Sequence, residues 1–215
     1  MKPDLLAFDV ECRRCKRLAE FLDTVRDDHP DYHARPVAPF GDPQAHLLIV
    51  GLAPGMHGAN ATGRPFTGDH AGILLYQTLF DFGFASRPTS VTRDDGLELR
   101  DCRITNAVKC LPPQNKPLSS EIKCCNDFLK VELESLPAGA VIVALGRIAH
   151  DAVLRALFKR AKDFVFGHAA EHALDGSLIL LDSYHCSRYN TQTRRLTEDM
   201  FRAVFTRARA LLGQV

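Results

Sequence analysis

The sequence has almost no net charge and no long hydrophobic run. Its 27 lysine and arginine residues nearly balance 26 acidic residues, which gives a formal charge of +1 at pH 7. Overall charge therefore does not by itself indicate a nucleic-acid-binding protein. No apolar run approaches the roughly 20 residues that cross a bilayer, and segment 1–4 lacks the apolar core of a secretion signal. We therefore expect a cytoplasmic protein that does not enter membranes.

The composition is that of an ordinary folded chain. Hydrophobic residues make up 46% and charged residues 25% of the 215 positions, which excludes disordered and collagen-like proteins. No internal repeat, low-complexity tract or interdomain linker interrupts the chain. Because a chain of this length can bury one substantial core, we expect residues 1–215 to form a single domain.

Basic residues are concentrated at two places despite the balanced total. One cluster lies near the N-terminus and the other within the last thirty residues. Their members are Arg13, Arg14, Lys16 and Arg17, then Arg188, Arg194, Arg195, Arg202, Arg207 and Arg209. Such clusters can neutralise phosphates, and DNA binding of this kind would place the protein at the nucleoid. A solvated helix face is the alternative interpretation.

Short apolar runs alternate with segments of helical periodicity. The expected strands are Leu47–Val50, Ile104–Val108, Val141–Leu145 and Leu178–Leu181. Five helices are expected. One follows Cys15, one spans 71–82, one runs from an N-cap at Ser119 to Leu136, and the last two span 148–157 and 196–212. This alternation predicts an α/β fold with three α/β/α layers around a central, mostly parallel four-stranded sheet. Segment 158–173 fits neither pattern. Ligands of such sheets bind beyond the carboxyl ends of the strands.

Four of the seven cysteines form a spacing that suits a metal centre. Cys12 and Cys15 make a CxxC pair, while Cys110 follows the second expected strand and Cys125 lies on the next expected helix. Four thiolates can hold either zinc or a [4Fe–4S] cluster, and spacing alone does not choose between them. Cys124 is an alternative fourth ligand, because helix geometry decides which of the two neighbouring thiols faces the metal.

Four motifs stand in order along the chain. They are GLAPG at 51–55, TGRPFTGD at 62–69, TNAVKCLPP at 105–113 and HCSRYNTQTRRLT at 185–197. Together with the cysteines, they resemble the iron–sulfur branch of the uracil-DNA glycosylase superfamily. Within that branch the sequence is most similar to family 5, because GLAPG stands where family 4 carries an acidic GEAPG. The resemblance extends from Cys12 to Thr197.

The resemblance implies a monofunctional DNA-repair glycosylase. Such an enzyme flips a damaged base out of double-stranded DNA, hydrolyses its N-glycosidic bond and leaves an abasic site. Uracil is the implied substrate, with the other deaminated bases hypoxanthine and xanthine. The implied cofactor is a structural [4Fe–4S] cluster on Cys12, Cys15, Cys110 and Cys125. We expect a monomer.

The resemblance also assigns the base pocket. Phe66 matches the aromatic floor on which the flipped base stacks, and Asn106 matches the asparagine that reads the polar edge of the base, since an amide both donates and accepts. His185 matches the histidine that donates a hydrogen bond to the base as negative charge develops. Gly51 and Ala53 belong to the first motif, which also lines the base.

The water-positioning residue is open between two candidates. Ala53 stands where other branches carry a polar side chain in the first motif. Asn60 is the matching downstream substitute, but an amide can only orient water and cannot act as a general base. Asp69 is the nearest carboxylate in the loop. We therefore expect Asn60 or Asp69 to position the water.

The last motif departs from the family pattern. Arg188, Tyr189 and Asn190 are the expected DNA contacts, and Tyr189 stands where other branches insert an apolar wedge into the vacated base stack. Cys186 replaces the proline that follows the histidine in most relatives. These changes leave a rival interpretation, a catalytically weak module on the same fold that binds damaged DNA. A cluster-dependent redox protein and a zinc-stabilised hydrolase of free nucleotides are further alternatives.

Overall fold

A central sheet organises the chain, which the computed structural model describes over residues 8–213. Its strands are β1 (Phe40–Gly41), β2 (Leu47–Gly51), β3 (Cys102–Asn106), β4 (Val141–Leu145), β5 (Glu171–Ala173) and β6 (Ile179–Ser183). They lie in the order β1-β3-β2-β4-β6-β5. The four central strands are parallel, and β1 and β5 add antiparallel edges.

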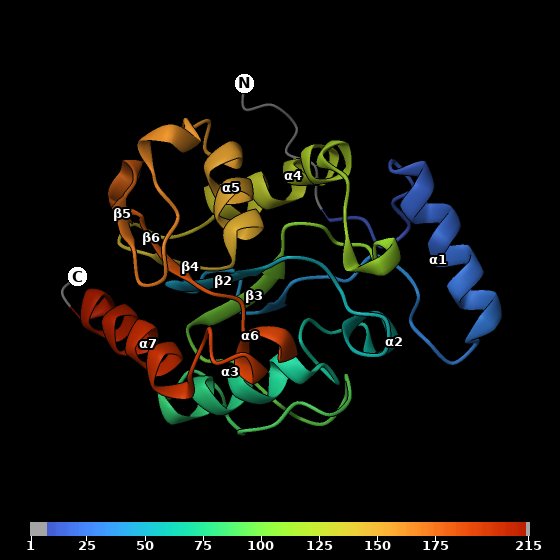
Figure 1. The fold of residues 1–215 in the computed structure, drawn as a ribbon, viewed down its shortest axis with the longest axis horizontal. Helices are drawn as coiled ribbons and strands as arrows, with labels where there is room; N and C mark the ends of the chain where they lie inside the picture. Colours follow the sequence, from blue (N-terminus) through green and yellow to red (C-terminus); the bar gives the residue numbers. More distant parts are fainter. Residues whose placement is uncertain (1–7, 214–215) are drawn as a thin grey trace.

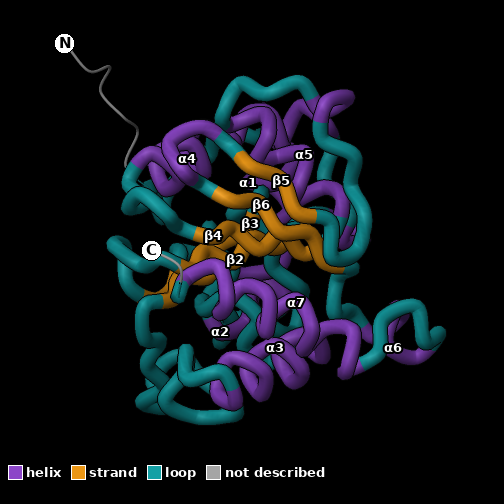
Figure 2. Tube along the Cα trace, turned by 90° about the vertical axis from the view of Figure 1, so that its left-hand side faces the viewer, coloured by secondary structure: helices purple, strands orange, loops and turns teal. Residues whose placement is uncertain are grey.

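Helices cover both faces of the sheet. They are α1 (Lys16–Asp28), α2 (Ala59–Thr62), α3 (His70–Asp81), α4 (Ser119–Glu134), α5 (Arg147–Ala156), α6 (Arg188–Gln192) and α7 (Glu198–Leu212). Figure 1 shows α4 and α5 on one side of the sheet and α3 and α7 on the other, with α1 at the end of the molecule. The side view in Figure 2 shows the same three layers. None of the helices in the described part is long and apolar enough to cross a membrane.

Alternating side chains of the strands build two cores. Ile49 and Val143 face the layer of α3 and α7, whereas Leu48 and Ile142 face α4 and α5. Both sets are fully buried, because successive side chains of a strand point to opposite faces. This explains why the strands read as continuous apolar runs rather than as alternating ones.

The three-layer α/β prediction is confirmed, and two details of it are corrected. The sheet has six strands rather than four, because β1 and β5 have only two and three residues and are too short to carry a sequence pattern. Segment 158–173, which fitted no pattern, supplies β5. Ser119 is the first residue of α4 rather than its N-cap; the cap is Leu118, whose backbone N–H donates to Glu121 Oε2 at 2.7 Å.

Candidate active site

A cleft of about 570 Å³ opens at the carboxyl ends of the parallel strands. It is lined by residues that follow β2, β3, β4 and β6. Among them are Ala53, Phe66, Asp69, Asn106, Gly146, His185 and Arg188. The structure therefore brings together side chains from all four sequence motifs or their neighbours, at the edge where an open α/β sheet binds ligands.

Phe66 and Asn106 meet over Gly51. Gly51 on β2 pairs with Asn106 on β3, and a Cβ atom added at Gly51 would lie 2.4 Å from Asn106 Oδ1 and 2.7 Å from Phe66 Cζ. Only glycine permits this approach. Gly72 does the same behind Phe66, where a Cβ would lie 1.8 Å from the Phe66 carbonyl oxygen. The two glycines thus allow the ring and the amide to lie side by side.

The backbone of Phe66 is held in an unusual conformation. Its φ of +57° falls in the left-handed region, which is uncommon for bulky residues. Such conformations cost about 1–3 kcal/mol and persist only where the surroundings hold them. The ring is 6% exposed and lines the cleft. A strained aromatic residue at a cleft wall is typical of a functional site.

Arg64 helps to hold the loop that carries Phe66. It stands in the second motif, but the sequence assigned it no role. Its side chain is 3% exposed and binds Asp95 Oδ1 at 2.7 Å, and its Nε donates to Thr67 Oγ1 at 3.0 Å. Tyr76 donates to the Pro65 carbonyl at 2.6 Å. Although burial acts in the opposite direction, backbone N–H donors and Arg64 lower the pKa of Asp95 to about 2. The loop is therefore fastened on both sides of Phe66.

Asn106 presents an unpaired acceptor. The residue is 4% exposed, and its Oδ1 atom is buried without a hydrogen-bond partner among the described residues. Leaving a buried polar atom unpaired costs about 1–3 kcal/mol. A ligand that donates a hydrogen bond to Oδ1 from the cleft would recover this cost.

His185 faces Phe66 across the cleft. The two rings are stacked, with centroids 6.0 Å apart and an angle of 25° between their planes. Burial lowers the pKa of His185 to about 4, so the imidazole is neutral at pH 7. Its Nδ1 is buried without a partner among residues 8–213. Asn190 Nδ2 donates to the His185 carbonyl at 2.8 Å, which fixes the backbone at this position.

The two candidates for positioning water are placed differently. Asp69 lines the cleft, accepts a hydrogen bond from the Ala59 backbone N–H at 3.2 Å, and has a pKa that burial raises. Asn60 is fully buried and is not among the residues that line the cleft. Neither amide atom of its side chain has a partner within the described chain. The geometry therefore favours Asp69.

The last motif places its three expected DNA contacts in three different ways. Arg188 lies at the cleft. Tyr189 is 70% exposed and lies outside the cleft lining. The Asn190 side chain is occupied by its bond to the His185 backbone. Cys186 is fully buried in the core with α3 and α7, so the replacement of proline alters no exposed surface.

One wall of the cleft comes from a segment that the motifs do not cover. Leu145, Gly146, Arg147 and Ile148 lie at the end of β4 and the start of α5, and all line the cleft. The apolar run of β4 ends at a glycine, and this pattern could have predicted a cleft wall after β4, because the carboxyl ends of parallel strands meet at one edge of the sheet. The four sequence motifs, in contrast, lie at or after the other three strands.

The cysteines gather around a second, much smaller recess of about 10 Å³. It is lined by Cys12, Cys15, Cys110, Cys124 and Cys125. Cys125 is buried and its Sγ accepts from the Lys109 backbone N–H at 3.2 Å, while Cys124 is more exposed. No three of these sulfur atoms lie within 4.8 Å of one another in the described part of the chain. Cys102 and Cys186 are buried elsewhere.

Known protein families provide an independent comparison. The family model described as the uracil DNA glycosylase superfamily matches residues 38–209. A type-5 uracil-DNA glycosylase of Thermus thermophilus is 47% identical over 207 residues, which cover 94% of each chain. One of Pyrobaculum aerophilum is 43% identical over 95% of this chain and 90% of its own. A type-4 enzyme of Sulfurisphaera tokodaii is 27% identical over 91% and 79%.

Proposed function

This chain belongs to the uracil DNA glycosylase superfamily, and from that premise we propose that it excises uracil from double-stranded DNA as a monofunctional, monomeric glycosylase of one domain. Hypoxanthine and xanthine are the further substrates. One observation carries the proposal: the unpaired Oδ1 of Asn106, buried beside the Phe66 ring in a cleft that also holds His185. This arrangement offers a flat base one stacking surface and one hydrogen-bond acceptor.

Base recognition follows from the chemistry of these groups. A uracil flipped out of the duplex would lie against Phe66, because aromatic side chains stack on bases of any kind. Its N3–H would donate to Asn106 Oδ1, and the Asn106 amide N–H would donate to a base carbonyl. The narrow space above Gly51 keeps the amide and the ring fixed relative to each other, so little ordering is needed when the base arrives.

Bond cleavage separates charge, and the cleft supplies groups for both ends. As the bond between C1′ and the base breaks, negative charge grows on the base and positive charge on the sugar. The neutral His185 donates a hydrogen bond to the base oxygen that gains charge. The Asp69 carboxylate also lines the cleft, where it stabilises the sugar cation and orients the attacking water.

The absence of lysine from the cleft supports hydrolysis rather than strand cleavage. A bifunctional glycosylase needs an amine that attacks the sugar to form a Schiff base. No lysine of the described residues lines the cleft. Lys109, the lysine of the third motif, is fully buried and binds Glu132 Oε1 at 2.5 Å. The product is therefore an abasic site in an intact strand.

The cysteine recess supports an iron–sulfur cluster. Four thiolates bound to one zinc ion at about 2.3 Å would all lie within about 3.8 Å of one another, whereas no three of the described sulfur atoms lie within 4.8 Å of one another. A [4Fe–4S] cluster on Cys12, Cys15, Cys110 and Cys125 would cross-link the segment before α1 to the loop after β3 and to α4. That loop begins directly after Asn106, so the thiolates that hold it also steady the base-reading strand.

Base release from defined oligonucleotides tests this function. Anaerobically purified protein is incubated with duplexes and single strands that carry uracil, hypoxanthine, xanthine or only normal bases. We expect free base and alkali-labile sites from the damaged duplexes, and an intact strand before alkali. Damage-dependent binding without base release would identify a binding module instead. Strand breaks before alkali would contradict the monofunctional reaction.

A further inference from the structure

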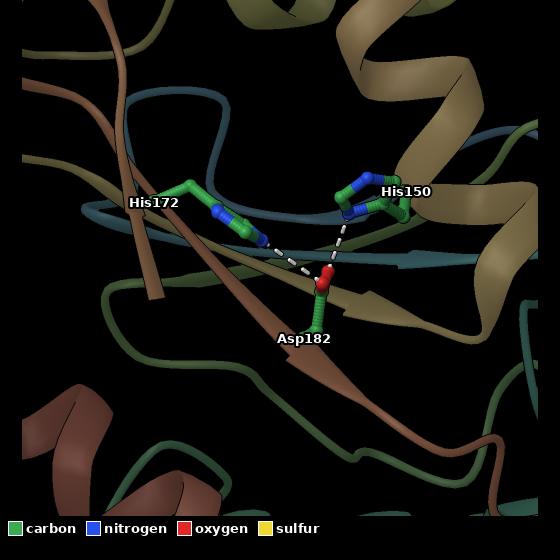
Figure 3. Close-up of side chains that lie close together, drawn as sticks. All are labelled: His150, His172 and Asp182. Carbon is green, nitrogen blue, oxygen red and sulfur yellow. Dashed lines mark hydrogen bonds and ion pairs between the residues drawn. The ribbon is translucent and has the colours of Figure 1, made fainter. Parts of the chain in front are cut away.

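Three titratable side chains meet outside the cleft, on the face of the sheet covered by α5. Asp182 on β6 is fully buried, and its Oδ1 lies 2.8 Å from His150 Nδ1 on α5. Its Oδ2 lies 3.2 Å from His172 Nε2 on β5. Figure 3 shows both imidazoles pointing at the one carboxylate. No motif of the family resemblance includes these residues.

Hydrogen bonding fixes the protonation of His150. Its Nε2 lies 3.0 Å from the Phe164 carbonyl oxygen, which can only accept, so Nε2 carries a proton. Its Nδ1 faces a carboxylate, which also accepts. With both nitrogens donating, His150 is an imidazolium and forms a neutral ion pair with Asp182. Burial lowers the pKa of His150, but the bond to Asp182 outweighs it and raises the pKa above its usual value.

Groups from three segments surround the pair. From β5, the His172 imidazole lies within hydrogen-bond distance of Asp182 Oδ2. From the segment before β5, the Phe166 ring lies edge-on at 5.6 Å. From α5 itself, Asp151 adds a second favourable negative charge. A metal ion held by His150 Nδ1, His172 Nε2 and Asp182 is the alternative occupant of this cluster, and it would require an unprotonated Nδ1.

The pair lies one helical turn below the cleft. His150 N donates to the Gly146 carbonyl at 3.1 Å, and Gly146 N donates to the Ser183 carbonyl at 2.8 Å. Gly146 lines the cleft, and a Cβ atom there would lie 3.5 Å from His185 Cβ. His185 itself follows Asp182 by three residues. The start of α5 and the end of β6 are thus the two walls that the pair joins.

We infer that His150 and Asp182 are positioning residues for the glycosylase reaction: their buried ion pair holds the start of α5 against the end of β6 and so sets the place of His185 in the cleft. This inference rests on the proposed function. A displacement of about 1 Å at a reacting group can cost about 100-fold in rate. Removal of the hydrogen-bond partners that support metal-binding residues, a comparable positioning role, costs about 10- to 100-fold.

A matched pair of substitutions tests the inference. His150→Leu removes the ion pair at similar volume. His46→Leu removes another histidine–aspartate pair, that of His46 with Asp101, which is half-exposed at the opposite end of the strands. Single-turnover release of uracil from a duplex is measured for both, with binding to a duplex containing an abasic-site analogue. We expect His150→Leu to lose about 10- to 100-fold in rate with little change in binding, and His46→Leu to match the wild type.

Measurements on the wild type keep the inference testable if His150→Leu does not fold. Nitrogen-15 NMR of the imidazoles should show protons on both ring nitrogens of His150 at pH 7, and purified protein should contain no zinc at this site. An unprotonated Nδ1, one zinc ion per chain that His150→Leu loses, or an unchanged release rate in that variant would each overturn the inference. A wild type that binds DNA but releases no base would overturn the proposed function, and the positioning role with it.

Discussion

The crowding around Gly51 predicts that Gly51→Ala inactivates the enzyme. Gly51 pairs with Asn106 across β2 and β3, and its α-carbon faces both the amide and the Phe66 ring. The added methyl group would lie 2.4 Å from Asn106 Oδ1 and 2.7 Å from Phe66 Cζ. Non-bonded carbon atoms prefer separations of about 3.5–4.0 Å, so each neighbour must move by roughly 1 Å.

The surroundings make that movement costly. Asn106 lies on a strand between two paired neighbours, and Gly72 backs the Phe66 carbonyl without space to spare. Overpacking of this kind costs about 1–3 kcal/mol of stability. A misplacement of about 1 Å in the base-reading groups lowers the rate by about 100-fold. We therefore expect a destabilised but folded variant whose rate of uracil release is about 100-fold below that of the wild type.

Single-turnover uracil release and thermal unfolding measure the two effects separately. Gly213→Ala at the end of α7 is the control, because its Cβ would lie 3.5 Å from the Arg209 carbonyl oxygen and 3.9 Å from that of Ala210, which are ordinary contacts. We expect the control to match the wild type. A folded Gly51→Ala protein that releases uracil at the wild-type rate would refute the placement of the base beside Asn106 and Phe66.

Three further predictions follow from the same geometry. Asp69→Asn should lower the rate of uracil release by about 100-fold or more. Asn60 lies outside the cleft lining, so Asn60→Ala should change that rate by less than about tenfold. Equal losses in single-turnover assays would contradict the assignment of Asp69 as the residue that positions water. The pKa of His185, about 4 in the folded protein against 6.5 unfolded, makes the unfolded chain bind more protons below pH 6.5. Stability should thus fall by up to about 3 kcal/mol between pH 6.5 and 4, and urea unfolding should show a flatter pH dependence for His185→Gln. Cys125→Ser should abolish the visible absorption of an iron–sulfur cluster, whereas the Cys124→Ser protein should retain that absorption. The reverse pattern would make Cys124 the fourth ligand.

Sequence patterns predicted the sheet where burial was continuous. The runs of β2 and β4 are apolar at every position because helices cover both faces of the sheet. The edge strand β5 was missed because only one neighbour pairs with it and its side chains are partly exposed. Its place depends on antiparallel pairing with β6, which follows after residues 174–178, rather than on the preferences of its own three residues.

The candidate site, like the sheet, could be predicted only in part. Motifs and family resemblance identified Phe66, Asn106 and His185, which the structure places around one cleft. They could not identify Arg64 and Asp95, because these residues act through the backbone of the loop that holds Phe66. Positive φ at Phe66 has no sequence signature either, since tertiary contacts rather than residue type impose it.

Release of free uracil by the protein and by its Asn106→Ala variant tests the central claim most directly. Both proteins are incubated with a duplex that contains one uracil, the free base is quantified, and the visible spectrum of each sample is recorded. The structure predicts release by a cluster-loaded wild type and a loss of at least about 100-fold in the variant, because both the stacking partner and the acceptor must hold the base for the bond to break. Equal release by the two proteins, or none by a folded and cluster-loaded wild type, would contradict the account.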